Sequence, residues 1–191
     1  IQMDFKAHLQ TTWDLFISRI VSLLILTLVF FAAGVITLGI LAPVASAGYF
    51  HSILRLVREG REPKPQDVFS HLRLFLPLLA FGLVVFVLIL IGTLLLVLPG
   101  ILFFLAVSFF CLYMLPMMTD KELGLFEAVK QSFTVTTNRA AEQMVVFLIF
   151  AGISALGSSF FIGALFTQPF ATIFLMSIYH KEVDTHTIIK P

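Results

Sequence analysis

The sequence predicts an all-α polytopic membrane protein, with six transmembrane helices arranged as three hairpins in a single domain that covers residues 1–191. Two observations lead to this fold class. The 191 residues are 59% hydrophobic and only 12% charged, which is about half the charge of an ordinary soluble domain. The charged residues also fall in four short windows, and the three runs between them carry no charge. Apolar surface in such excess has to face lipid.

Each charge-free run has about the length of two crossings. The runs are Ile20–Leu54, Leu74–Thr119 and Gln143–His180, with 35, 46 and 38 residues. One crossing takes about 20 apolar residues. A straight helix over the second run would extend roughly 69 Å, more than twice the ~30 Å hydrocarbon core. We therefore expect each run to fold back on itself as a hairpin.

Proline and glycine near the middle of each run mark the expected reversals. Proline lacks a backbone donor and favours the start of a helix. The predicted hairpin apices are Pro43, Pro99 with Gly100 in "VLPGI", and Pro169. All charged residues then lie on one side of the membrane. The positive-inside rule makes that side cytoplasmic, so we expect a multi-pass protein of the inner (cytoplasmic) membrane with both termini in the cytoplasm.

The three hairpins also form a predicted pseudo-threefold repeat. Asp14, Asp67 and Glu127 each open a short amphipathic segment before a charge-free run. The repeat units cover about residues 11–58, 64–119 and 120–184. Amphipathic segments beside a span are typical of short helices that lie in the membrane surface.

The third such segment, Gly124–Ala140, is the best defined. At 100° per residue its charged and amide side chains share one arc, and its large apolar side chains take the other side. Gly124, Ala128 and Ser132 follow one another at four-residue steps. Small residues at this spacing allow another helix to approach closely. We interpret them as a packing stripe of an interfacial helix.

Positive charge is concentrated between the first and second hairpins. Gly60 is expected to cap the helix before it, and Pro63 and Pro65 prevent helix in the turn that follows. Basic side chains beside a membrane attract anionic headgroups by about 1 kcal/mol each. Alternatively they only set the orientation of the chain. The candidate contacts for lipid headgroups or a partner are Arg55, Arg58, Arg61, Lys64 and Arg73.

Several classes of function find no support in the sequence. The net charge of +1 implies no nucleic-acid partner. The sequence contains no metal-binding motif, no catalytic Ser-His-Asp set and no phosphate-binding glycine loop, so we expect neither an enzyme nor a cofactor. The single cysteine, Cys111, lies in an apolar run and cannot form an internal disulfide. His51 and His180 lie near the charged ends of returning helices, where an interface explains them.

The central third of the chain resembles a known family. "LPG" at the start of a Phe-rich span, followed by "DKELGLFEAVKQSF", is similar to a six-helix bacterial and archaeal membrane family. That family includes the membrane domain of glycerophosphoryl diester phosphodiesterases and the YciC-like proteins of uncharacterised function. Leu125 stands where that family often has proline, and Phe133 where it often has tryptophan. The resemblance implies a six-helix membrane module without hydrolase activity, because the catalytic domain is a separate one. The matching residues are Pro99, Gly100, Asp120, Gly124, Ala128 and Ser132.

Two functions follow as hypotheses. The first is a non-enzymatic integral membrane protein that anchors or organises anionic lipid, another membrane protein or a second copy of itself at the cytoplasmic membrane. The alternative is a transporter or channel for an apolar or amphipathic solute, including lipid, because transporters place interrupted spans at binding sites. The second hypothesis requires a cavity lined by hydroxyl side chains. The candidates are Thr27, Thr37, Ser46, Thr93, Ser108, Ser154 and Ser158.

Overall fold

The computed structural model describes residues 5–95, 97–158 and 161–184, and all secondary structure in these residues is helical, as predicted. Two 3₁₀ turns, η1 (Pro65–Phe69) and η2 (Leu72–Leu74), precede α4, and a π-helical turn, η3 (Tyr179–Asp184), follows α9. The α-helices are α1 (Phe5–Ser18), α2 (Ile20–Ile36), α3 (Ala42–Glu59), α4 (Phe75–Leu95), α5 (Val97–Phe110), α6 (Met114–Asp120), α7 (Leu125–Asn138), α8 (Ala140–Ser158) and α9 (Phe161–Ile178).

Three of the described segments are long and apolar enough to cross a membrane, which is fewer than the six spans predicted. They are Pro65–Thr93, Leu98–Asp120 and Ala140–Gly157. A fourth is added if α1 and α2, which meet at a bend of 88°, form one broken span. Helix α3 ends in three charged residues within its last five positions, and charges are costly in hydrocarbon. These segments agree with a membrane protein, while the six crossings stay a prediction.

The first two helices of each charge-free run pack against each other: α2 on α3, α4 on α5, and α8 on α9. The first reversal contains Leu38 and Gly39, both with positive φ, at 51° and 84°. Pro43 follows in the first turn of α3, and Pro99 is the third residue of α5. Proline is favoured in the first turn because the amide hydrogens there have no partner within the helix.

Pro169 does not stand at the apex that was predicted for it. It lies well inside α9, and residues 159–160, between α8 and α9, lie outside the described part of the chain. Two glycines bring the helices together near this reversal. A Cβ atom at Gly157 would overlap the side chain of Thr167, and one at Gly163 would lie 3.0 Å from the carbonyl oxygen of Gly157. The missing side chains, rather than a proline, allow the two backbones to approach.

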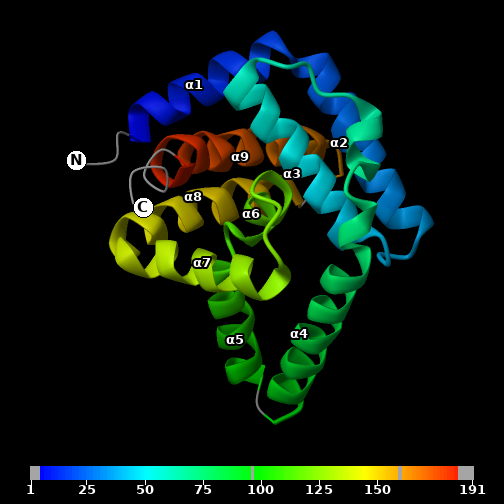
Figure 1. Ribbon diagram of the computed structural model, residues 1–191, viewed down its shortest axis with the longest axis vertical. Helices are drawn as coiled ribbons and strands as arrows, with labels where there is room; N and C mark the ends of the chain where they lie inside the picture. The colour runs from blue at the N-terminus through cyan, green and yellow to red at the C-terminus, as the bar shows by residue number, and fades with distance from the viewer. Residues whose placement is uncertain (1–4, 96, 159–160, 185–191) are drawn as a thin grey trace.

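The helices α4 and α5 also approach closely at glycines near their apex. The pair projects from the rest of the molecule. A Cβ atom at Gly92 would lie 3.2 Å from the Cα atom of Gly100. In Figure 1 the two helices run down the view and converge at the bottom, while α8 and α9 cross the view above them. Only 6% of the apolar window of α4 is buried. Since α4 is apolar on all sides, nearly its whole circumference requires an apolar environment.

Helix α9 forms the centre of the core. It packs against α1, α2, α3 and α8, and every residue from Ala171 to Tyr179 is buried. The surrounding buried side chains come from α1, α2, α3, α6, α7 and α8 and join in one hydrophobic cluster. The last helix therefore holds the charged end of the first and third predicted units together.

Candidate functional site

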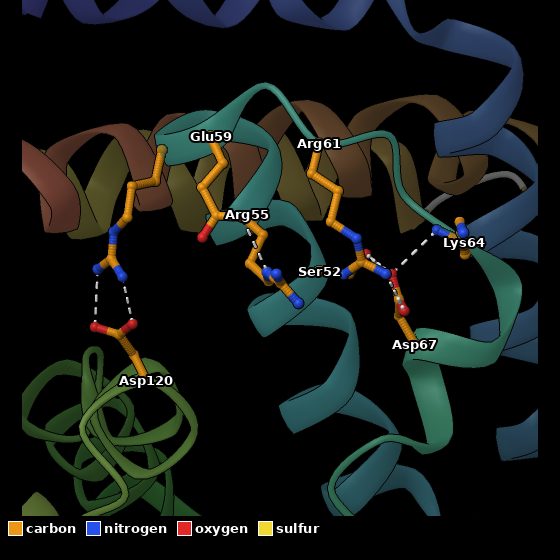
Figure 2. A network of polar contacts seen from close by, with 8 residues as sticks. Ser52, Arg55, Glu59, Arg61, Lys64, Asp67 and Asp120 are labelled. Carbon is orange, nitrogen blue, oxygen red and sulfur yellow. Dashed lines mark hydrogen bonds and ion pairs between the residues drawn. The ribbon is translucent and has the colours of Figure 1, made fainter.

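Asp67 is the centre of a polar cluster between α3 and the turn that precedes α4. Its carboxylate accepts hydrogen bonds from Ser52 Oγ at 2.8 Å, from the main-chain N–H of Lys64 at 3.1 Å and from the guanidinium of Arg61 at 3.0 Å (Figure 2). The Lys64 bond caps η1 in the way an acidic residue caps the first turn of a helix. Asp67 therefore holds the turn against α3, and its contact with Arg61 is one of the bonds that do so.

Asp120 is the centre of a second cluster, which joins three distant parts of the chain. Arg58 at the end of α3 donates two parallel hydrogen bonds to its carboxylate, at 2.6 and 2.8 Å. Tyr179, the first residue of η3, places its hydroxyl 3.5 Å from the same carboxylate. The carboxylate side chain is 11% exposed and that of Arg58 27% exposed. A bidentate pair at this burial is among the stronger charged contacts in proteins.

The remaining two predicted arginines form exposed ion pairs. Arg55 lies 3.2 Å from Glu59, one helical turn further along α3 (Figure 2). Arg73 lies 2.6 Å from Glu122 in the turn between α6 and α7. Arg73, by hydrogen bond and charge, holds the pKa of Glu122 below its ordinary value. Both pairs are open to solvent, where an ion pair contributes little to stability.

The predicted lipid contacts thus divide into four arginines that are paired within the chain and one exposed lysine. All four arginines are paired with carboxylates of the chain itself. A phosphate would have to displace a partly buried carboxylate to reach Arg58 or Arg61, which makes these two structural. The side chain of Lys64 is exposed.

Gly60 caps α3 as predicted, since it has a φ of 67° and its N–H bonds to the Leu56 carbonyl oxygen.

The small residues predicted to line α7 differ in their positions. Ala128 and Ser132 are fully buried. Ser132 Oγ donates to the Phe110 carbonyl oxygen at 2.7 Å and accepts from the Tyr113 N–H at 3.1 Å. These bonds satisfy backbone groups that the end of α5 leaves open. Gly124 instead precedes the helix, and a Cβ atom there would meet open space.

Two surface helices present large apolar side chains outward. Trp13 on α1 is 57% exposed, and Phe126 on α7 is 89% exposed. Each helix buries its other face: α1 turns Thr12 inward and α7 turns Ser132 inward. Both are followed by a non-helical arginine and then by a long apolar helix. An exposed aromatic on such a helix is typical of the membrane–water interface.

A cavity of about 280 Å³ opens between the start of α1 and the end of α9. His8 Nδ1 and Ser177 Oγ lie 2.7 Å apart within it. Both side chains are nearly buried, at 3% and 7% exposure. Lys181, in the π-helical turn, is exposed at the rim. The lining residues are Ala7, His8, Thr11, Val57, Ser177, His180 and Lys181.

The buried tyrosines were not identified from the sequence. The chain has three, and Tyr49, Tyr113 and Tyr179 are all fully buried. Tyr49 lies in α3, Tyr113 lies between α5 and α6, and Tyr179 is the first residue of η3. Tyr49 bonds to Thr27 at 3.0 Å, and Tyr113 donates to Gln143 at 2.6 Å. Each charge-free run contains one tyrosine, and this pattern in the sequence could have indicated that the three are buried.

No group of metal-ligating side chains is present in residues 5–95, 97–158 and 161–184. The geometry of the described residues is therefore that of polar clusters which join helices, together with a cavity at the charged end. No protein-family model, curated protein or solved structure matches the chain. The resemblance of the central motif to a six-helix membrane family stays a prediction from those residues. Asp120 of that motif pairs with Arg58, which is a structural role that the motif alone did not indicate.

Proposed function

We propose that this protein is a non-enzymatic, multi-pass protein of the cytoplasmic membrane that binds and organises anionic lipid on the cytoplasmic side. In this proposal each of the three helix pairs enters the membrane, and both termini and all the charged windows face the cytoplasm. Partner proteins or further copies of the chain would be recruited through the same face.

The observation that carries the proposal is that α1 and α7 each expose an aromatic face. Each has one face that is buried and an exposed face with an aromatic side chain, Trp13 or Phe126. Lysines accompany them: Lys6 and Lys130 are the basic residues of these helices. Helices of this kind lie at the headgroup level, where lysine attracts anionic lipid and the aromatic ring enters the acyl boundary.

The transport hypothesis loses part of its basis. Four of the seven hydroxyls that were expected to line a pathway donate to carbonyl oxygens of their own helix, one turn earlier: Thr27, Thr37, Ser46 and Thr93. Side chains that bond back to their own backbone supply no donor to a passing solute. The hydroxyl-lined cavity that would favour transport is therefore not supported by these four residues.

The first experiment uses Trp13, the chain's only tryptophan. The full chain is reconstituted in vesicles, and Trp13 fluorescence is measured with lipids brominated at different acyl positions. Strong quenching by shallow bromines and weak quenching by deep ones is the expected result. A matched variant, Trp13→Phe with Phe126→Trp, moves the probe to α7 and should behave alike. Tryptophans that no bromine quenches would show that these helices face water.

The second experiment tests the topology. In a Cys111→Ser background, a membrane-impermeant maleimide is applied to Leu38→Cys and, separately, to Lys64→Cys. Leu38 is 91% exposed at the α2–α3 turn, and Lys64 is exposed in a charged window. We expect labelling from opposite sides of the membrane. Labelling of both from one side would refute a first helix pair that spans.

A further inference from the structure

We propose that the cavity between α1 and α9 is a binding site for a phosphate-bearing anion, the headgroup of an anionic lipid. This inference rests on the proposed function and deepens it, since it assigns lipid recognition to one place. Arg58 and Arg61 do not supply such a place, because partly buried carboxylates of the chain are paired with them. The cavity draws instead on His8, His180 and Lys181.

The lining is suited to an anion. Lys181 contributes a full positive charge and three hydrogen-bond donors, and each imidazole contributes at least one ring N–H. None of the described residues that line the cavity is acidic, so the charge of Lys181 meets no carboxylate among them. A metal cation would be repelled by Lys181, and a wholly apolar ligand would make no use of its charge. Phosphate oxygens accept strong, charge-assisted hydrogen bonds from a lysine ammonium.

The lining is also built into the fold. The contact between His8 and Ser177 joins residues 169 positions apart at 2.7 Å. Thr11 donates to the Ala7 carbonyl oxygen at 2.9 Å, which holds its side chain against the helix. Helices α1 and α9 pack together along this edge. The position of the imidazole of His8 therefore follows from helix packing and not from an exposed loop, and such sites lose little entropy on binding.

The location favours a lipid over a free phosphate. Helix α1 exposes Leu9 and Trp13 along the surface that leads away from His8. Acyl chains can lie on such an apolar strip while the phosphate enters the cavity beside Lys181. The same helix is the one proposed to lie at the headgroup level. A soluble phosphoester would use the donors of the cavity but would gain nothing from this strip.

The test compares variants of the full chain in vesicles of phosphatidylcholine with or without phosphatidylglycerol. Lys181→Gln removes the charge at the rim, and Lys64→Gln removes a matched exposed charge elsewhere. Ala7→Phe fills the cavity from the α1 side without any change in charge. Circular dichroism and gel filtration verify that each variant is folded, and native mass spectrometry in mild detergent counts the bound phosphatidylglycerol. Inorganic phosphate is added in a separate arm as the competitor.

We expect Lys181→Gln to lower phosphatidylglycerol affinity at least about fivefold, because one lysine near a headgroup contributes about 1 kcal/mol. Ala7→Phe should lower it similarly, and Lys64→Gln should change it less than either. Equal effects of Lys181→Gln and Lys64→Gln, or no effect of Ala7→Phe, would overturn the site while leaving the proposed function intact. Absence of phosphatidylglycerol enrichment by the unaltered chain would defeat both. Full displacement of the lipid by inorganic phosphate would overturn the lipid headgroup as the ligand.

Discussion

Replacing Arg58 with alanine should destabilise the protein far more than replacing the nearby Arg55. Arg58 makes two hydrogen bonds to Asp120, at 2.6 and 2.8 Å, with side chains that are 27% and 11% exposed. Arg55 makes one exposed contact with Glu59, at 3.2 Å and with 39% and 45% exposure. The two arginines lie on the same helix, so they form a matched pair in which burial of the ion pair is the main variable.

The magnitudes follow from these exposures. Removing one partner of a buried ion pair costs about 3–5 kcal/mol, because the other charge is left without compensation. Solvent reaches part of Arg58, so we expect about 2–3 kcal/mol for Arg58→Ala. An exposed pair one turn apart in a helix contributes only about 0.3–0.5 kcal/mol, which is our expectation for Arg55→Ala.

The assay is denaturant unfolding of the full chain in mixed micelles, followed by helical circular dichroism. The double variant Arg58→Met with Asp120→Leu removes both charges of the pair. It should regain most of the lost stability, because it leaves no buried charge without a partner. Equal losses for Arg58→Ala and Arg55→Ala would refute the reasoning. So would a double variant as unstable as Arg58→Ala alone.

Three further predictions concern other parts of the fold. Gly157→Val should cost about 1–3 kcal/mol and disturb the α8–α9 crossing, whereas Gly152→Ala, where a Cβ atom meets open space, should be tolerated in the same unfolding assay. Tyr113→Phe should cost about 1–2 kcal/mol, because the buried amide oxygen that accepts its hydroxyl loses that hydrogen bond; an unchanged midpoint would mean that the bond is dispensable. Arg73 lowers the pKa of Glu122, so their pair stabilises the fold above the unfolded-state pKa and loses this effect as the pH falls through the lowered one. Glu122→Gln should therefore lose slightly less stability than the unaltered chain as the pH is lowered. An identical loss would contradict this.

Local sequence signals predicted the parts of the fold that depend on neighbouring residues. The expected α7 over Gly124–Ala140 is found as Leu125–Asn138, and the glycine cap at Gly60 is present. Pro43 and Pro99 lie in the first turn of a helix, as predicted. Proline geometry, glycine at positive φ and the helical repeat act within a few residues, so they can be inferred without a partner segment.

The same signals were insufficient where the outcome depends on a distant segment. A proline can start a helix or lie inside one, and Pro169 lies inside α9, while glycines allow the close approach of α8 and α9. The arginines of the second charged window, Arg55–Arg73, were predicted as one set. Two are partly buried, because their carboxylate partners lie in η1 and at the end of α6. Nothing in the window itself distinguishes those two from Arg55.

The sequence by itself determined that the chain is helical, that its apolar surface exceeds what a soluble core can bury, and that its charges are confined to four windows. These are properties of composition and period, and they hold whatever the helices pack against. Only the tertiary structure decided that Arg58 meets Asp120 across 62 positions and that His8 meets Ser177 across 169. Such contacts depend on which helices pack together, and many pairings satisfy the same hydrophobic pattern. The cavity between α1 and α9 therefore became visible only in the folded chain.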